Sequence, residues 1–177
     1  MQDTMKEFSI EIWNDECLKT VFYTVRFTDE TENETDKFLS KYYHQPLYKA
    51  SVVDLLNYLL VAIGNRHGAI DAFFNRNEHQ VFGLPNSGKM RVETLTYHFP
   101  GFPLRLYALR ITEELVVLLS GGLKNARTNQ ESSLSHNWLL SCDFARKIIR
   151  NVSEGVISVD ANARRLNHFQ SGVEIVL

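Results

Sequence analysis

Basic side chains gather at one end of an otherwise apolar segment, residues 103–127. Its first half is a strand-like stretch that carries Arg105 and Arg110, and its second half runs into Gly-Gly-Leu-Lys-Asn-Ala-Arg, which contains Lys124 and Arg127. Guanidinium and ammonium groups on a rigid hairpin are suited to holding a phosphate. Glycine also allows a ligand to approach the backbone closely. The segment therefore predicts a phosphate-binding site.

Two interpretations of this hairpin stay open. Alternation along a strand places Arg105 and Tyr107 on one face, and Leu104, Leu106 and Arg110 on the other. Both faces are mostly apolar, so the strand is expected to be central, with both sides covered. A buried arginine then needs an acidic partner or a wet cleft, because burying an unpaired charge is costly. The adjacent glycines likewise either end the strand or admit a ligand.

Hydrophobic periodicity predicts the elements that must position these cations. Alternating and β-branched stretches predict strands at residues 8–13, 21–27, 79–84, 90–99, 104–111 and 115–120. Helical spacing of apolar residues predicts helices at 52–65 and 134–152, and a short helix near 37–43. No repeat or linker interrupts the chain, so residues 1–177 are expected to form one α+β domain.

Bulk properties narrow the possible partners. A net charge of -2 over 177 residues excludes a globally basic nucleic-acid binder, so a local patch must hold any anion. Two cysteines and six histidines show no metal-ligand spacing, and we expect no metal and no cofactor. The apolar runs are too short to cross a bilayer, and the first residues lack a signal pattern. We expect a cytoplasmic protein that does not engage a membrane.

Residues 83–89, Gly-Leu-Pro-Asn-Ser-Gly-Lys, match the first seven positions of a nucleotide-binding P-loop. The next position should be Ser or Thr and is Met90, and the following residues favour a strand where the motif requires a helix. We therefore interpret this segment as a hairpin turn.

Three short motifs and the order strand, helices, meander resemble the RelE/HigB/ParE toxin superfamily of bacterial type II toxin–antitoxin pairs. The motifs are Lys-Met-Arg-Val-Glu-Thr-Leu from residue 89, Leu-Arg-Leu-Tyr-Ala-Leu-Arg from residue 104, and Leu-Val-Val-Leu-Leu from residue 115, which leaves through Gly-Leu-Lys-Asn-Ala-Arg. The match covers roughly residues 80–130. It implies a small antiparallel sheet packed against N-terminal helices, with an extra N-terminal hairpin and a C-terminal extension, residues 133–177, that includes a helix.

In ribonuclease members of this family, several cations and sometimes a tyrosine surround the scissile phosphate, and no metal is needed. The resemblance implies these residues here: Arg91, Arg105, Tyr107 and Lys124 for catalysis, and Lys89, Arg110 and Arg127 for binding the RNA backbone. Attack by a 2′-hydroxyl builds negative charge that preorganised cations stabilise. His98 and Glu93 are candidates for the general base, and a structural role for both stays open.

The predicted function is that of a toxin which cleaves mRNA and thereby inhibits translation. Its expected partners are a cognate antitoxin protein and RNA, free or ribosome-bound, and the oligomeric state is left open. Three features depart from the family: the greater length, the mildly acidic net charge, and Asn125 and Ala126 in place of a second lysine. The alternative is the same fold used as a binding protein without catalysis.

Overall fold

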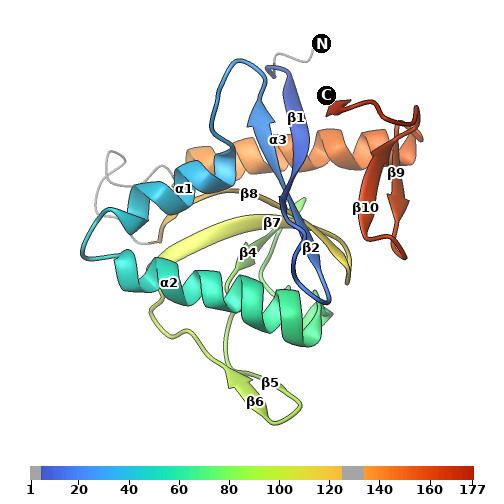
Figure 1. Cartoon of the computed structure of the whole chain (residues 1–177). Helices are drawn as coiled ribbons and strands as arrows, with labels where there is room; N and C mark the ends of the chain where they lie inside the picture. The colour runs from blue at the N-terminus through green and yellow to red at the C-terminus, as the bar shows by residue number, and fades with distance from the viewer. Residues whose placement is uncertain (1–4, 125–133) are drawn as a thin grey trace.

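A seven-stranded mixed sheet is the framework of the protein (Figure 1). The computed structural model describes residues 5–124 and 134–177. The sheet has the order β11-β1-β2-β8-β7-β4-β3. Its strands are β1 (Phe8–Asn14), β2 (Val21–Phe27), β3 (Asn77–Glu78), β4 (Val81–Leu84), β7 (Leu104–Thr112), β8 (Leu115–Leu123) and β11 (Ile175–Val176). Two separate hairpins pair β5 (Met90–Val92) with β6 (Leu95–Tyr97), and β9 (Ile157–Asp160) with β10 (Arg165–His168).

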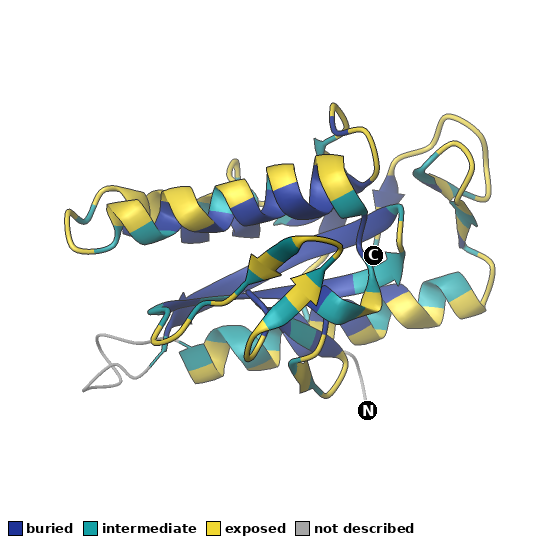
Figure 2. Ribbon diagram, turned by 90° about the horizontal axis from the view of Figure 1, so that it is seen from below, coloured by how far each residue is buried: buried dark blue, intermediate teal, exposed yellow. Residues whose placement is uncertain are grey.

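Helices cover both faces of the sheet. The helical elements are α1 (Glu34–Tyr43), α2 (Lys49–Asn57), its π-helical continuation η1 (Tyr58–His67), the short 3-10 turn η2 (Asp71–Phe73) and α3 (Leu134–Ser153). The first three pack on one face and α3 packs on the other, so two apolar cores flank the sheet. Figure 2 shows the buried residues concentrated in the central strands and on the inward sides of the helices.

Strand β7 contributes side chains to both cores, as its alternation predicts. Leu104, Leu106 and Ala108 enter the core beneath α1 and α2. Tyr107 and Leu109 enter the core beneath α3. The neighbouring strand β8 is buried along its whole length. The prediction of a central strand covered on both sides is therefore confirmed.

The two glycines near the end of β8 serve close packing inside the sheet. The register between β7 and β8 shifts between Leu106 and Ala108, where Leu106 pairs with Gly121. A Cβ atom at Gly121 would lie 2.2 Å from the carbonyl oxygen of Arg105 and 3.0 Å from the ring of Phe38. A Cβ atom at Gly122 would lie 3.2 Å from the backbone of Leu134, at the start of α3. Neither glycine ends the strand.

We expect the Gly121→Ala variant to lose about 3 kcal/mol of unfolding free energy, because the added methyl group overlaps backbone that cannot move aside. Urea denaturation measures this loss. Gly122→Ala is the graded comparison and should lose less, since its nearest neighbour is at 3.2 Å. A loss below about 0.5 kcal/mol at Gly121 would contradict the close approach of β7 and β8.

The predicted α+β class, the 52–65 helix and the C-terminal helix are confirmed, whereas the purely antiparallel sheet is wrong. Strand β2 lies parallel to β8, with Phe22 opposite Val116. The N-terminal hairpin β1–β2 is thus inside the sheet and is no addition to it. The strand expected at 90–99 is two short strands, β5 and β6, which pair only with each other (Figure 1). Short-range alternation alone does not reveal which sheet a strand joins.

The residues after α3 return to the main sheet. Strand β11 pairs with β1 through Ile175 opposite Ile10. The backbone nitrogen of Leu166, in β10, donates a hydrogen bond of 3.0 Å to the hydroxyl of Tyr23. Residues 134–177 therefore complete the second face and one edge of the sheet, although the sequence predicted them as an extension. No helix in the described ranges is both long and apolar enough to cross a bilayer.

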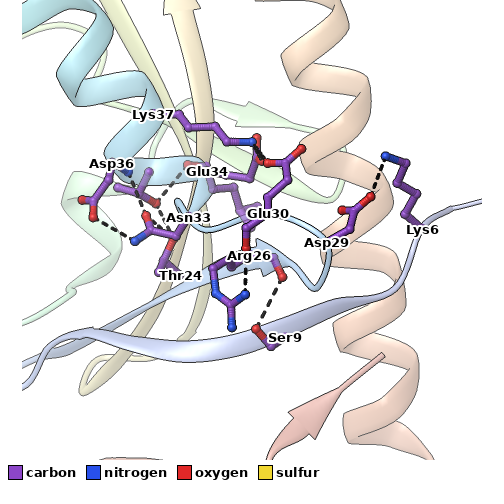
Figure 3. Close-up of polar contacts among 12 residues, drawn as sticks. Lys6, Ser9, Thr24, Arg26, Asp29, Glu30, Asn33, Glu34, Asp36 and Lys37 are labelled. Atoms are coloured by element: carbon purple, nitrogen blue, oxygen red, sulfur yellow. Dashed lines mark hydrogen bonds and ion pairs between the residues drawn. The ribbon is translucent and has the colours of Figure 1, made fainter.

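Polar contacts fix the start of α1 against the sheet (Figure 3). The side chain of Asn33 accepts a hydrogen bond of 2.8 Å from the backbone nitrogen of Asp36, as an N-cap residue does. Lys37 forms ion pairs with Glu30 and with Glu34, the latter at 2.7 Å. Thr35 joins the helix to the sheet, because its hydroxyl donates a hydrogen bond of 3.1 Å to the carbonyl of Leu119 on β8.

Candidate phosphate-binding site

Arg105 is the centre of the candidate site. It lies on β7, and its Nη1 donates to the carboxylate of Glu78 on β3 at 2.7 Å. The side chains of Arg105 and Glu78 are 14% and 23% exposed, so the pair is mostly shielded from water. The ion-pair interpretation of Arg105 is therefore confirmed. The partner lies on the edge strand, two strands away across β4.

A second arginine lies against the first. Arg76 directly precedes β3, and its Cδ atom, like that of Arg105, occupies the space above Gly83 on β4. A Cβ atom at Gly83 would come within 2.7 Å of Arg76 and 3.0 Å of Arg105. Burial, followed by the positive charge of Arg105, lowers the pKa of the Arg76 guanidinium, while Glu78 opposes the shift. An arginine stays charged under these conditions. The lowered pKa therefore reflects the burial of Arg76 first and the nearby charge of Arg105 second.

Lys124 joins these two arginines at the end of the sheet. It follows β8, and its backbone nitrogen donates to the carbonyl of Pro103 at 2.7 Å. Arg76, Arg105 and Lys124 line one narrow hollow together with the rings of Phe99 and Phe102. Two of the predicted catalytic residues, Arg105 and Lys124, therefore line the same hollow, whereas Arg91 does not line it. We call Arg76, Arg105 and Lys124 the cation cluster.

Tyr107 and Glu78 connect the cation cluster to a larger pocket of about 510 Å³. The pocket is lined by Asn77, Glu78, His79, Tyr107, Leu134, Ser135 and Trp138. Tyr107 is opposite Gly83 in the sheet and is 2% exposed. Burial, followed by the negative charge of Glu78, raises the pKa of the Tyr107 phenol, and Arg105 opposes the shift. Tyr107 therefore stays protonated and acts as a hydrogen-bond donor rather than a base.

The remaining predicted site residues lie elsewhere. Lys89 and Arg91 are exposed, and Arg91 lies on the β5–β6 hairpin, which projects from the body of the protein (Figure 1). Arg110 lies at the other end of β7, where it pairs with Asp71 at 3.2 Å. Arg127 lies outside the described residues. Of the two cations predicted after the second strand of the hairpin, Lys124 is thus the one that the structure describes.

The two candidates for the general base lie on the β5–β6 hairpin or just after it. Glu93 occupies its tight turn with φ 56, and His98 is exposed directly after β6. The P-loop-like segment is a connection between β4 and β5, which belong to different sheets. Its residue Asn86 is buried and accepts a hydrogen bond of 2.9 Å from the hydroxyl of Tyr58. No helix follows this segment, and it is not a hairpin turn either.

Sequence reasoning missed Arg76, Glu78, His79 and Trp138. The signal available was the spacing Arg76-x-Glu78, which places two opposite charges on one face of a strand. That strand is only two residues long, and the predicted strand began at His79. Trp138 lies within the predicted helix at 134–152, and its indole nitrogen donates to the carbonyl of Glu78 at 3.1 Å.

The arrangement can stabilise negative charge through its cationic side chains. Within residues 5–124 and 134–177, no three His, Cys, Asp or Glu side chains are grouped to hold a metal ion. Three cations line one hollow, and Glu78 forms an ion pair with one of them, Arg105, so the cluster carries excess positive charge. Models of known protein families, curated proteins and solved structures contain no match to this chain.

Proposed function

We propose that the cation cluster binds a phosphate of RNA, and that the protein is a RelE/HigB-like toxin which cleaves mRNA without a metal. The crowding of Arg76 against Arg105 supports this proposal most strongly. Glu78 forms an ion pair with Arg105 and only lies near Arg76, and among the described residues neither Arg76 nor Lys124 forms an ion pair. A bound phosphate would relieve their repulsion and accept hydrogen bonds from both arginines.

The geometry suggests a route for the proton. A phosphate that binds Arg105 replaces Glu78 as the partner of this arginine. The freed carboxylate of Glu78 then accepts the proton of the attacking 2′-hydroxyl. The 2′-oxygen forms a bond to phosphorus as the bond to the 5′-oxygen breaks, and the proton taken up by Glu78 returns through solvent to the leaving oxygen. The products are a 2′,3′-cyclic phosphate and a 5′-hydroxyl. Tyr107 holds Glu78, so we regard it as a positioning residue.

The toxin assignment also rests on the resemblance of residues 80–130 to the superfamily. It implies a cognate antitoxin, which would cover the cation cluster, and an RNA substrate that is free or bound to the ribosome.

Induced expression in a bacterial host tests the proposal through Lys124. We expect wild-type protein to arrest growth and Lys124→Ala to relieve the arrest, because loss of one charge-stabilising group lowers the cleavage rate on the order of 100-fold. The matched control is Lys89→Ala, which removes an equal charge from an exposed position outside the cluster and should arrest growth like the wild type. Equal relief by both variants would contradict the assignment of the site to Lys124.

The Arg105–Glu78 ion pair also favours a second candidate, a binding protein of the same fold without catalysis. In that case Glu78 neutralises Arg105 permanently, and the pair is structural. Growth arrest that survives Arg105→Ala and Lys124→Ala in folded protein would favour this candidate, because target binding then uses another surface.

A further inference from the structure

The 510 Å³ pocket beside the cation cluster has the size of a small-ligand site, for which about 300–1,000 Å³ is typical. Glu78 and Tyr107 line this pocket and also contact Arg105. A phosphate held by the cation cluster would therefore have the pocket as its immediate neighbour. In a nucleic acid, the group next to a phosphate is a nucleoside.

Two aromatic rings form a wall of the pocket. The centroids of His79 and Trp138 are 5.5 Å apart, with the ring planes inclined at 47°. The hydrogen bond from the Trp138 indole nitrogen to the carbonyl of Glu78, 3.1 Å long, holds the tryptophan ring in place. An aromatic surface beside a cationic groove is the usual arrangement for binding single-stranded nucleic acid, because every base has a π-face.

The turn between β3 and β4 places His79 at the pocket. His79 has φ 67, a left-handed conformation in which histidine is one of the more frequent non-glycine residues. It lies at the turn between β3 and β4, where Glu78 pairs with Val81. Glycine or asparagine would satisfy this turn more easily. Ser135 and Glu78 add polar groups to the same pocket.

We propose that this pocket is a nucleobase subsite, in which one base of the RNA stacks on Trp138 and His79 while an adjacent phosphate lies on the cation cluster. This inference rests on the proposed function, since it takes the ligand of the cluster to be RNA. It extends that function by assigning base binding to the aromatic wall formed by His79 and Trp138. Single-stranded RNA with an unpaired base is thus the ligand, and a duplex is excluded from the pocket.

The test uses the full chain carrying Trp13→Phe, so that Trp138 is the remaining tryptophan of the two in the sequence. Trp13 lies in the opposite core, against Phe22, and its replacement leaves the pocket intact. The probe is a short single-stranded 2′-O-methyl RNA, which cannot be cleaved through its 2′-oxygen, and a matched set with one abasic position. We expect the intact probe to quench Trp138 fluorescence and one abasic probe to quench it much less.

Fluorescence anisotropy of labelled probes then separates stacking from positioning. We expect Trp138→Ala to weaken binding of the intact probe roughly tenfold or more, the effect of losing one base stack, and Trp138→Phe to weaken it less. Trp138→Ala should bind the sensitive abasic probe as wild type does. Equal weakening on intact and abasic probes would overturn the subsite, because Trp138 would then act only on the backbone of Glu78. If no probe binds the wild type at all, the proposed function itself fails.

Discussion

The Arg105→Ala variant is expected to cleave RNA at least about 1,000 times more slowly than the wild-type protein. Arg105 is the member of the cation cluster that contacts Glu78, so its loss removes both a phosphate ligand and the partner of the proposed base. Loss of one preorganised donor alone reduces the rate about 100- to 1,000-fold. Cleavage of RNA in extracts, with a chelator present, measures the change in rate.

Arg110→Ala is the matched control for Arg105→Ala. It removes the same side chain from the same strand, but at the far end of β7 and on the opposite face, where Arg110 contacts Asp71. The control is expected to cost stability and to keep the cleavage rate of the folded protein within about threefold. Thermal melting corrects both variants for unfolded material. Equal rate losses would contradict the placement of the site at Arg105.

The Phe144→Ala variant is expected to lose about 4 kcal/mol of unfolding free energy, the cost of deleting a buried phenylalanine ring. Phe144 is fully buried on α3, and its ring packs edge-on against Phe8 with centroids 4.7 Å apart. It also contacts Phe27, so the variant removes contacts between α3 and both N-terminal strands. Urea denaturation followed by far-UV circular dichroism measures the loss.

Leu139→Ala on the same helix provides the comparison. Leu139 is 55% exposed, and its truncation should change stability by less than about 0.5 kcal/mol. If Phe144→Ala also costs less than about 1 kcal/mol, then α3 is an appendage, as the sequence suggested, and not part of the core. A large cost shows that α3 is part of the core.

The fold was predictable where the periodicity of apolar residues is sufficient to identify a single helix or strand. Alternation along 104–109 predicted the two faces of β7, and helical spacing predicted α2 with its continuation and α3. The parallel pairing of β2 with β8 was not predictable, because strand direction in a sheet depends on the crossover between distant segments. The separate β5–β6 hairpin was missed for a related reason. Residues 90–99 have strand-forming side chains throughout, and only the turn at Glu93, with φ 56, divides them.

The candidate site was predictable in part. Arg105 and Lys124 lie on the hairpin that the sequence singled out, and the structure places them in one hollow. Glu78 lies on a two-residue edge strand and Arg76 directly precedes that strand, and their contact with Arg105 of β7 passes over Gly83, a residue without a side chain. Such a contact leaves no pattern in the sequence. Arg91 was expected at the site because residues 90–99 were placed in the main sheet, and this placement was wrong.

The central claim is that the cation cluster promotes attack of a 2′-hydroxyl on an RNA phosphate. The most direct test maps 5′-hydroxyl RNA ends in bacterial cells that express the wild-type protein or Arg105→Ala, because this readout includes ribosome-bound mRNA. The account predicts many new 5′-hydroxyl ends within mRNA in wild-type cells and few in Arg105→Ala cells. Equal numbers of such ends in the two cultures, with both proteins folded and present at the same level, would contradict it.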